Sequence, residues 1–540
     1  MMRGIAIVLL SASVGTACSS AGTDEAPTLE VLTPERGTLS DSSTVRVTGR
    51  ASTSRVTVNG TEAIVQKDGT FEATLSVEDG ITLIETHAIS GDVDLRDVRA
   101  VMAGPLSPTD GSVSGPIAAR VGADGFMKVG GALASTAQAL DWQNLALGMN
   151  PIYDSSGCNS AVINIQELSV GTIGIGLTPK SGAVAAGVTI DDVYVKMKVN
   201  FRAVCIGGST TAVVRSSRAH INGDLALAAK GGKLDATLPA SSVALDGFSL
   251  DISGVPGAIE SLVRGKVREA AEKALNNVIK DQVPTKAGEA LGGLLAQPLE
   301  TNLLSHATTF SISPSSVVID DTGLIAAVDA KVLVAGGEGG MFVSTPMPLD
   351  SMTWGEGHIG LALADDLVNQ LLSGLWSTGA IQPTVQLEGP LAVLNAVLDG
   401  NTKALKLDMK LPPMVRANNG QLELQVGDLI LSARDASDVE LQSFALSLST
   451  TLAAAPSASG NIAVTLGEPT IKAQVLVQSP TEDTSGEQLE GIVDGAWGLV
   501  GNMLGDTLGA MPMPSVAGMQ VGAPALKGQQ GFLLVDVPLQ

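Results

Sequence analysis

Two long stretches of the chain repeat apolar residues at three- and four-residue steps. The first runs from about Gly257 to Lys280 and the second from about Glu487 to Gly509. This spacing predicts two amphipathic helices, each with one apolar face. The residues that we assign to these faces are Ile259, Leu262, Val263, Val267 and Leu275 in the first helix, and Ile492, Val493, Val500, Met503 and Leu504 in the second.

Apolar and polar residues alternate over most of the remaining chain after about Ile117. The clearest case is Val193 to Phe201, where every second residue is apolar and Tyr194, Lys196, Lys198 and Asn200 lie between them. A period of two predicts an antiparallel strand with one buried face. Shorter helical patterns cover Met127 to Leu140 and Leu367 to Trp376.

The order of these predicted elements repeats along the chain. A short helix, many strands and a long helix follow one another twice. A long helix laid against a curved antiparallel sheet leaves an elongated apolar gap between the two. We therefore expect an α+β fold that contains two copies of one wrapped-sheet unit.

The segment from residue 28 to 103 has a different pattern of short strands and frequent turns. Val45–Val47 and Val56–Val58 alternate, and Asn59-Gly60 and Asp68-Gly69 are tight-turn signals. We predict an all-β sandwich here. The spacing resembles that of bacterial immunoglobulin-like (Ig-like) modules, which act as spacers or binding modules. Residues 104–116, rich in Pro, Gly and Ser, predict a linker.

The N-terminus has the pattern of a targeting segment. Arg3 precedes an apolar run from Ile5 to Leu10, and small residues lead to Cys18. This resembles a bacterial lipoprotein signal peptide over residues 1–17, with Cys18 as the lipidated residue and 18–27 as a tether. Ser19 resembles the outer-membrane sorting pattern, so we expect an outer-membrane lipoprotein of the cell envelope. The alternative is an ordinary secretory signal cleaved nearby.

The composition limits which partners the chain can bind and which side chains can fill its core. Hydrophobic residues make up 44% of the chain but aromatic residues only 3%, so aliphatic side chains, alanine and glycine must fill the core. A net charge of −23 without a basic run disfavours nucleic acid and anionic membrane headgroups as partners. Apart from Cys18, the cysteines are Cys158 and Cys205. In an oxidising compartment this even pair predicts a disulfide, and two unpaired buried thiols are the alternative.

The sequence offers little catalytic chemistry. The chain has 4 histidines, none of which is paired at metal-ligand spacing. Adjacent residues of a strand point to opposite faces, so Asp191-Asp192 make poor acid–base partners. We interpret them as turn or strand-edge acids between predicted strands Val184–Ile190 and Val193–Ala203. No nucleophile elbow, zinc-protease or phosphate-loop motif is present. Gly336–Gly340 lacks a following Lys-Ser/Thr, so it predicts a flexible hairpin tip. We therefore expect no enzyme, no metal and no cofactor, and keep a hydrolase only as a third hypothesis.

The order of elements from about Ile117 to Gln540 resembles the bactericidal/permeability-increasing protein (BPI) family of tubular lipid-binding (TULIP) proteins. The resemblance depends on the strand Val243–Ile252 before the first long helix, and on Leu361–Asn369, where a strand leads into a helix. The ending Leu508-Gly509-Ala510-Met511-Pro512-Met513-Pro514 after the second long helix also matches. The family's basic lipopolysaccharide-binding tip is not evident here, and its strand-to-helix disulfide is not matched.

The resemblance implies two rolled sheet-plus-helix domains end to end, 117–335 and 336–540, each with an apolar pocket for acyl chains. We expect the chain to bind or carry a phospholipid or another acyl lipid without chemical change. The alternative is a structural or adhesive surface scaffold with solid cores and an Ig-like interaction module. Gly501, Gly505 and Gly509 predict a helix that lies close on its own sheet, or a smooth wall against a lipid chain.

Overall fold

The computed structural model describes most of the chain between the N-terminal segment and the C-terminus. The described residues are 27–252, 264–269, 271–273, 276–277, 280, 284–285, 299–337, 339–344, 352, 354, 359–388, 398–418, 421–456, 461–479, 483–495, 497, 511–512, 525–529 and 531–537. Two compact units divide the chain. One comprises Met1–Thr33, Arg46–Leu75 and Glu85–Asp97, and the other Pro34–Val45, Ser76–Ile84 and Val98–Gln540.

Two small sheets form over the N-terminal segment, as the all-β prediction requires. The four-stranded sheet has the order β1 (Leu29–Thr33), β3 (Thr44–Ala51), β7 (Thr70–Ser76) and β6 (Ile64–Val65). The five-stranded sheet has the order β2 (Thr38–Ser40), β9 (Val93–Ala103), β8 (Gly80–Ser90), β4 (Val56–Val58) and β5 (Thr61–Glu62). Asn59 and Gly60 form the predicted tight turn, both at positive φ.

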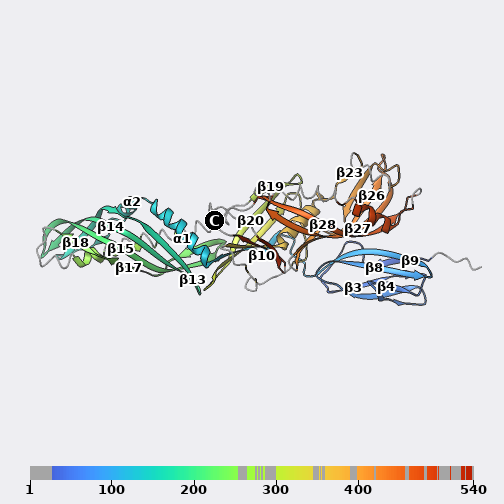
Figure 1. Ribbon diagram of the computed structural model, residues 1–540, viewed down its shortest axis with the longest axis horizontal. Helices are drawn as coiled ribbons and strands as arrows, with labels where there is room; N and C mark the ends of the chain where they lie inside the picture. The colour runs from blue at the N-terminus through green and yellow to red at the C-terminus, as the bar shows by residue number, and fades with distance from the viewer. Residues whose placement is uncertain are drawn as a thin grey trace, which may run out of the picture. The chain divides into compact units, whose positions relative to one another are not determined.

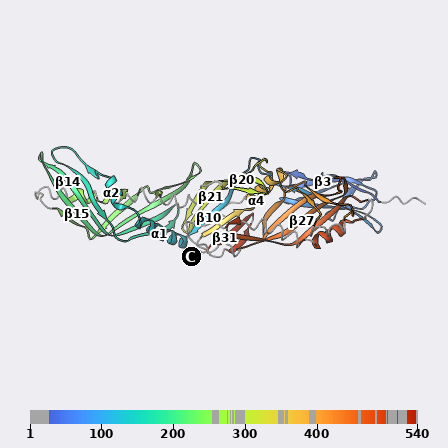
Figure 2. The same cartoon turned by 90° about the horizontal axis from the view of Figure 1, so that it is seen from above.

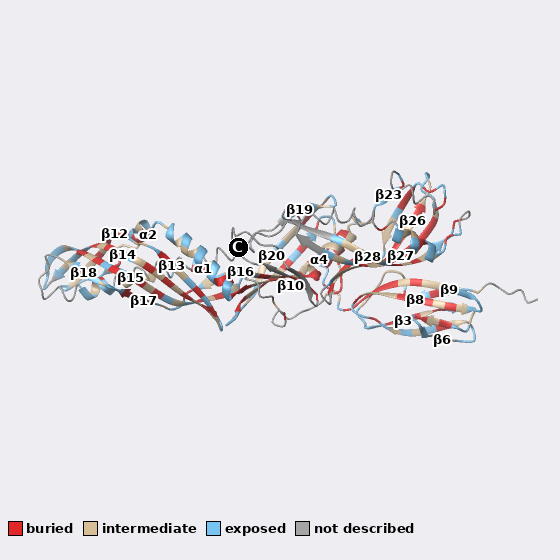
Figure 3. Ribbon diagram, viewed as in Figure 1, coloured by how far each residue is buried: buried red, intermediate tan, exposed pale blue. Residues whose placement is uncertain are grey.

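An eight-stranded antiparallel sheet follows, and two strands dominate it (Figure 1). β14 (Ala183–Ala203) and β15 (Ile206–Lys230) pair from Val184 to Ala203, with Asp192 skipped. The other strands are β11 (Tyr153–Asp154), β12 (Ser160–Ser169), β13 (Ile173–Lys180), β16 (Lys233–Thr237), β17 (Ser241–Asp246) and β18 (Ser249–Ile252). Buried and more exposed residues alternate along these strands (Figure 3), because one face is turned toward an apolar interior.

Helices accompany this sheet. α1 (Ala123–Gln138) covers the predicted short helix and packs on β13, and α2 (Trp142–Gly148), which we did not predict, packs on β12. Residues 264–269, 271–273 and 276–277 are helical, within the first predicted long helix. Lys280 is helical as well, and the other residues of that helix, including Ile259, Leu262, Val263 and Leu275, lie outside the described residues.

A seven-stranded sheet joins strands that are distant in the sequence. Its order is β19 (Leu299–Leu303), β20 (His306–Asp320), β21 (Gly323–Val334), β10 (Ser112–Gly122), β22 (Ile359–Ala364), β31 (Phe532–Val537) and β30 (Ala525–Gln529). β10 starts within the stretch that we expected to be a linker and pairs with both β21 and β22. One strand therefore joins the segments on both sides of residue 335.

A second seven-stranded sheet contains β23 (Thr384–Gln386), β24 (Ala404–Met409), β26 (Gln421–Arg434), β27 (Glu440–Pro456), β28 (Asn461–Val477) and β29 (Met511–Pro512), with β25 (Met414–Asn418) on β26. Residues 486–495 and 497 are helical, within the second predicted long helix. α4 (Asp365–Ser377) covers the predicted short helix and lies against β21, β10 and β25 (Figure 2). The antiparallel sheets and these helices confirm the α+β class.

Two local predictions were wrong. We expected separate strands before and after Asp191-Asp192, but β14 is continuous, and its pairing with β15 keeps one register on both sides of Asp192, which has φ 50°. One residue on each strand, Asp192 and Ser217, has no pairing partner there, so the ladder is interrupted without ending the strand. We expected Gly336–Gly340 to be a flexible hairpin tip. A Cβ at Gly340 would instead collide with Ser373, so this segment packs directly against α4.

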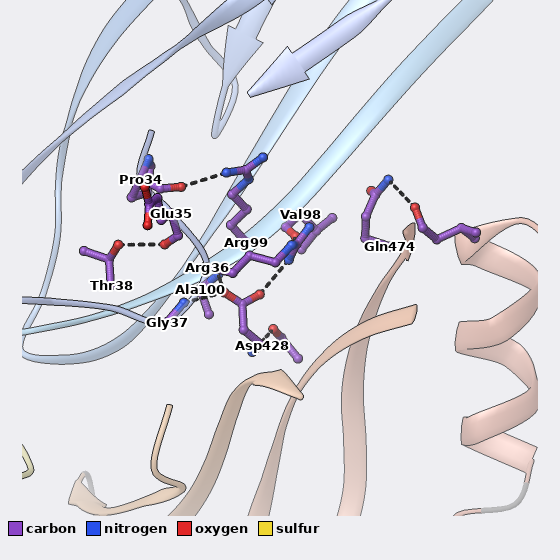
Figure 4. A network of polar contacts seen from close by, with 12 residues as sticks. Pro34, Glu35, Arg36, Gly37, Thr38, Val98, Arg99, Ala100, Asp428 and Gln474 are labelled. Carbon is purple, nitrogen blue, oxygen red and sulfur yellow. Dashed lines mark hydrogen bonds and ion pairs between the residues drawn. The ribbon is translucent and has the colours of Figure 1, made fainter. Parts of the chain in front are cut away.

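A buried polar cluster ties residues 34–38 to β26 within the second compact unit (Figure 4). The Arg36 guanidinium donates to the Val98 carbonyl and to the Asp428 carboxylate, each at 2.7 Å. Asp428 also accepts from the backbone N–H groups of Gly37 and Ala100, each at 3.2 Å. This carboxylate therefore organises three segments that are far apart in the sequence.

Candidate functional site: apolar interiors and the α4 helix

The eight-stranded sheet encloses what we term the first interior. Its inward residues on β14 are aliphatic and buried, and the helical segment contributes Val267 and Ala271. The full set on these elements is Val184, Ala186, Val188, Ile190, Val193, Val195, Met197, Val199, Val267 and Ala271. Val267 is thus the one member of the predicted site in the first helix that the described residues place, and it lies on the apolar face as expected.

Amide side chains complete the edges of this sheet. Gln138, at the end of α1, donates to the Gly171 carbonyl and accepts from the Ile173 N–H, both at 2.9 Å. Gln143 of α2 donates to the Gln166 carbonyl at 3.0 Å and accepts from the Leu168 N–H at 2.6 Å. A carboxamide presents one donor and one acceptor, so it can replace a missing strand partner. These residues fix both helices on the sheet.

The second interior lies between the last sheet and helical residues 486–495. Its buried residues are Leu387, Leu398, Leu405, Val426, Leu429, Ala433, Phe444, Leu446, Ala473 and Leu489. Val493 packs against this cluster, and Ile492 is half-buried. The Glu490 carboxylate accepts from the Ala473 N–H at 2.9 Å, and the Trp497 indole N–H donates to the Gly467 carbonyl at 2.8 Å. Val500, Met503 and Leu504, like the glycines from 501 to 509, lie outside the described residues.

The α4 helix buries its polar side. Asn369 donates to the Val415 carbonyl at 2.9 Å and accepts from the Val415 N–H at 2.7 Å, which reproduces a strand pairing on β25. The Asp365 carboxylate accepts from the Ala417 N–H at 2.7 Å, and the Ser373 hydroxyl donates to the Met341 carbonyl at 2.8 Å. Asp366 and Gln370 on the same side are buried as well.

The apolar side of α4 is the more accessible one. Leu367, Leu371 and Leu372 are half-buried, and Val368 is 40% exposed. We call these four residues the α4 apolar face. A surface helix of a globular protein normally packs its apolar side inward and leaves its polar side to water. In α4 the polar side is buried and most of the apolar side is accessible, although Leu375 on the apolar side is only 5% exposed. The sequence pattern alone could not reveal this.

Asp365 has unusual electrostatics. Burial raises its pKa to about 7, and the neighbouring Asp366 adds to this, while the hydrogen bond from Ala417 and the charge of Arg416 act in the opposite direction. A carboxyl group removed from water favours its neutral form. Asp365 therefore titrates near neutral pH.

Reactive groups are not gathered at these interiors. His220 pairs with Asp246 at 2.9 Å and Arg218 with Asp191 at 2.6 Å, on the outer face of the first sheet. Among the described residues, no cluster of three or more histidine, cysteine or acidic side chains could hold a metal ion. Across the same residues, no helix is long and apolar enough to cross a membrane. Cys158 and Cys205 form the predicted disulfide. Cys18 lies outside the described residues.

Comparison with known proteins gives partial and distant similarities. Residues 27–96 match the family model of glucodextranase domain B. No curated protein matches in sequence. The crystal structure of lipopolysaccharide binding protein is 13% identical, with a TM-score of 0.42, and the match covers 79% of this chain and 99% of that one.

Two further solved structures are P47 proteins of Clostridium botulinum. P47 of type E1 is 7% identical with a TM-score of 0.31, over 79% of this chain and 100% of that one. P47 of type A2 is 10% identical with a TM-score of 0.26, over 80% and 98%. The function proposed below therefore rests on the sequence and geometry of this chain.

Proposed function

We propose that the chain is a membrane-anchored bacterial lipoprotein that binds or carries an acyl lipid in apolar interiors and performs no chemistry on it. The anchor is the lipidated Cys18, and the location is the outer membrane of the cell envelope. The sequence of residues 1–18 supports the anchor, and the Cys158–Cys205 disulfide fits an oxidising compartment.

The reversed packing of α4 is the observation that carries this proposal. Asp365, Asn369 and Ser373 on its polar side are hydrogen-bonded to β25 and to Met341, so turning the helix over would break these bonds. Both amide atoms of the buried Gln370 have no hydrogen-bond partner among the described residues. Its apolar face is left accessible, and exposed apolar surface of this kind marks ligand-binding grooves or interfaces. An acyl chain lying along Leu367, Val368, Leu371 and Leu372 would remove this surface from water.

Hydrophobic transfer provides the driving force for such binding. Each methylene removed from water contributes about 0.8 kcal/mol. An interior made of aliphatic side chains has few polar groups to desolvate when an acyl chain enters. Both interiors are mainly aliphatic: the buried aromatic residues are Phe126 and Trp142 in the cluster of the first interior and Phe444 in that of the second.

The test is lipid uptake by the delipidated full chain, followed as displacement of a fluorescent fatty acid by unlabelled phosphatidylethanolamine. We expect saturable, competitive binding that weakens when Val368→Gln and Leu371→Gln are combined. The matched control is Leu476→Thr, because Leu476 on β28 is also 40% exposed and is not part of the α4 apolar face. Equal weakening by the control, or no uptake at all, would contradict the proposal.

A structural or adhesive scaffold is the second candidate. The deep burial of Val267, Ala271 and the inward residues of β14 favours it, because these side chains are already covered by protein. The same experiment separates the two functions. A scaffold with solid cores would take up no lipid, and the α4 substitutions would then alter surface hydrophobicity only.

A further inference from the structure

A closed ring of three hydrogen bonds fixes the first turn of α4. The Asp365 N–H donates to the Gly531 carbonyl at 2.9 Å, and the Gly531 N–H donates to the Ala417 carbonyl at 2.6 Å. The Ala417 N–H completes the ring by donating to the Asp365 carboxyl group at 2.7 Å. Asp365 therefore joins α4 both to β25 and to the residue directly before β31, through its main chain and its side chain together.

This attachment leaves buried polar atoms without partners. Asp365 is 5% exposed, and only Oδ2 of its carboxyl group accepts the bond from Ala417, while Oδ1 has no hydrogen-bond partner among the described residues. Gln370, on the same side of α4, is fully buried, and both of its amide atoms lack a partner there too. A buried polar atom without a partner costs free energy that contact with water would restore. The polar side of α4 is therefore poised to leave β25.

The charges around Asp365 do not compensate for its ionisation. Asp366 lies next to it on α4 and disfavours the ionised form, while Arg416 of β25 favours that form. The other charged residues on the strands that pack against α4 are Arg120 of β10 and Asp329 and Lys331 of β21. Burial outweighs the effect of Arg416, so the position of α4 on β25 favours a neutral Asp365.

We propose that Asp365 makes α4 a proton-controlled switch for lipid binding. With Asp365 protonated, α4 stays on β25 and presents the α4 apolar face to the lipid. Loss of the proton leaves a charge in a buried site, so the first turn of α4 moves from β25 toward water and the apolar face is no longer held in position. The inference rests on the proposed function, to which it adds the regulation of the same site.

The direction of the pH dependence follows from linkage. Burial, with a further contribution from Asp366, raises the pKa of Asp365 to about 7, against 3.8 for an ordinary aspartate. A lipid that binds only the helix held on β25 must therefore bind more tightly at low pH. We expect the affinity to be about 10-fold lower at pH 8 than at pH 6, since each pH unit above the pKa changes the ratio of the two forms tenfold.

The experiment measures binding of a fluorescent phosphatidylcholine to the delipidated full chain at pH 6 and at pH 8. The headgroup of this probe keeps its charge over this range, whereas a fatty acid would itself titrate. Asp365→Asn should bind at pH 8 as tightly as at pH 6, because asparagine is neutral and can still accept from the Ala417 N–H. Asp192→Asn, at an exposed acid, is the matched control and should keep the pH dependence of the parent.

Two charge variants should move the midpoint of this pH dependence in opposite directions. Asp366→Asn removes the negative charge that disfavours ionisation of Asp365, so the midpoint should fall. Arg416→Gln removes the positive charge that favours this ionisation, so the midpoint should rise. If Asp365 only supported the fold, the two variants would not shift the midpoint in opposite directions, and that result would overturn the proposal.

Hydrogen exchange without lipid tests the switch independently. The N–H groups of Val415 and Ala417 donate to the side chains of Asn369 and Asp365, so release of α4 exposes them to water. Their protection, corrected for the intrinsic effect of pH on exchange, should fall from pH 6 to pH 8 in the parent but not in Asp365→Asn.

The two measurements distinguish failure of the switch from failure of the proposed function. Lipid uptake that is equal at pH 6 and pH 8, with protection that is equal as well, would overturn the switch and leave lipid binding intact. No uptake at either pH would contradict lipid binding itself, and the exchange measurement would still show whether α4 is released.

Discussion

Arg36 and Asp428 lie 392 positions apart in the sequence, yet the Arg36 guanidinium donates to the Asp428 carboxylate at 2.7 Å (Figure 4). The side chains are only 15% and 1% exposed. Burial raises the pKa of Asp428, while Arg36 and the backbone donors act in the opposite direction. Removing one partner of a buried ion pair leaves the other charge without compensation.

Asp428→Ala should therefore lower the free energy of unfolding by about 3–5 kcal/mol, measured by urea denaturation. Combining it with Arg36→Met should recover part of this loss, because the double variant buries no unpaired charge. Glu72→Gln, which breaks the exposed Arg46–Glu72 pair, is the control and should have little effect. A loss in the double variant equal to the sum of the two single losses would argue against coupling.

Asp365 predicts a specific dependence of stability on pH. Its folded pKa is about 7, against 3.8 for an ordinary aspartate, so the folded chain holds this proton more tightly than the unfolded chain. Its contribution is therefore present at low pH and is lost as pH rises from about 4 to about 7, by up to about 4 kcal/mol.

Asp365→Asn removes this titration but keeps an oxygen that can accept from the Ala417 N–H. The variant should be more stable than the parent at pH 8, and its stability should fall less between pH 4 and pH 7. Urea denaturation at a series of pH values measures both effects. Asp192→Asn, at an exposed acid, controls for the change in net charge. An unchanged pH profile would show that Asp365 is not the group responsible.

Asn369 should be essential for holding α4 against β25. Asn369→Ala would leave both the N–H and the carbonyl of Val415 without their side-chain partner in a buried site. Each buried polar group left unpaired costs about 1–3 kcal/mol. We expect a clear drop in melting temperature, and a smaller one for Gln143→Ala, whose hydrogen bonds are more exposed. Equal effects would mean that burial does not distinguish the two amides.

The Cys158–Cys205 disulfide closes a loop of 47 residues. On the chain-entropy model such a closure stabilises the folded state by about 4 kcal/mol. Replacing both cysteines with serine should lower the urea midpoint accordingly, and a reducing agent should lower the midpoint of the parent but not that of the variant. An equal response of both proteins to the reducing agent would rule out a stabilising disulfide.

Much of the fold could be predicted because it follows from the local periodicity of apolar and polar residues. The alternation from Val193 to Phe201 predicted the inward face of β14, and the step pattern around Val267 and Val493 predicted helices that turn these residues toward a core. Period-two and period-3.6 patterns need no knowledge of distant residues. The even cysteine pair similarly predicted its disulfide.

The features that escaped prediction depend on partners far away in the chain. The pattern indicated turn or strand-edge acids at Asp191-Asp192, since nothing local shows that β14 continues past them in the same register against β15. The α4 pattern predicted a helix but not which side is buried, because the edge of β25 that accepts Asn369 is 46 residues away. Nothing in the sequence around Arg36 predicts that it pairs with Asp428. Tertiary hydrogen bonding decided each case.

The central claim, that this chain holds an acyl lipid, is tested most directly by native mass spectrometry of the full chain purified from a bacterial periplasm. Solvent extraction and lipid identification complete the measurement. The account predicts one or two lipid molecules per chain, with acyl tails. A chain that carries no lipid and does not bind added phospholipid would contradict the account and favour a scaffold with solid cores.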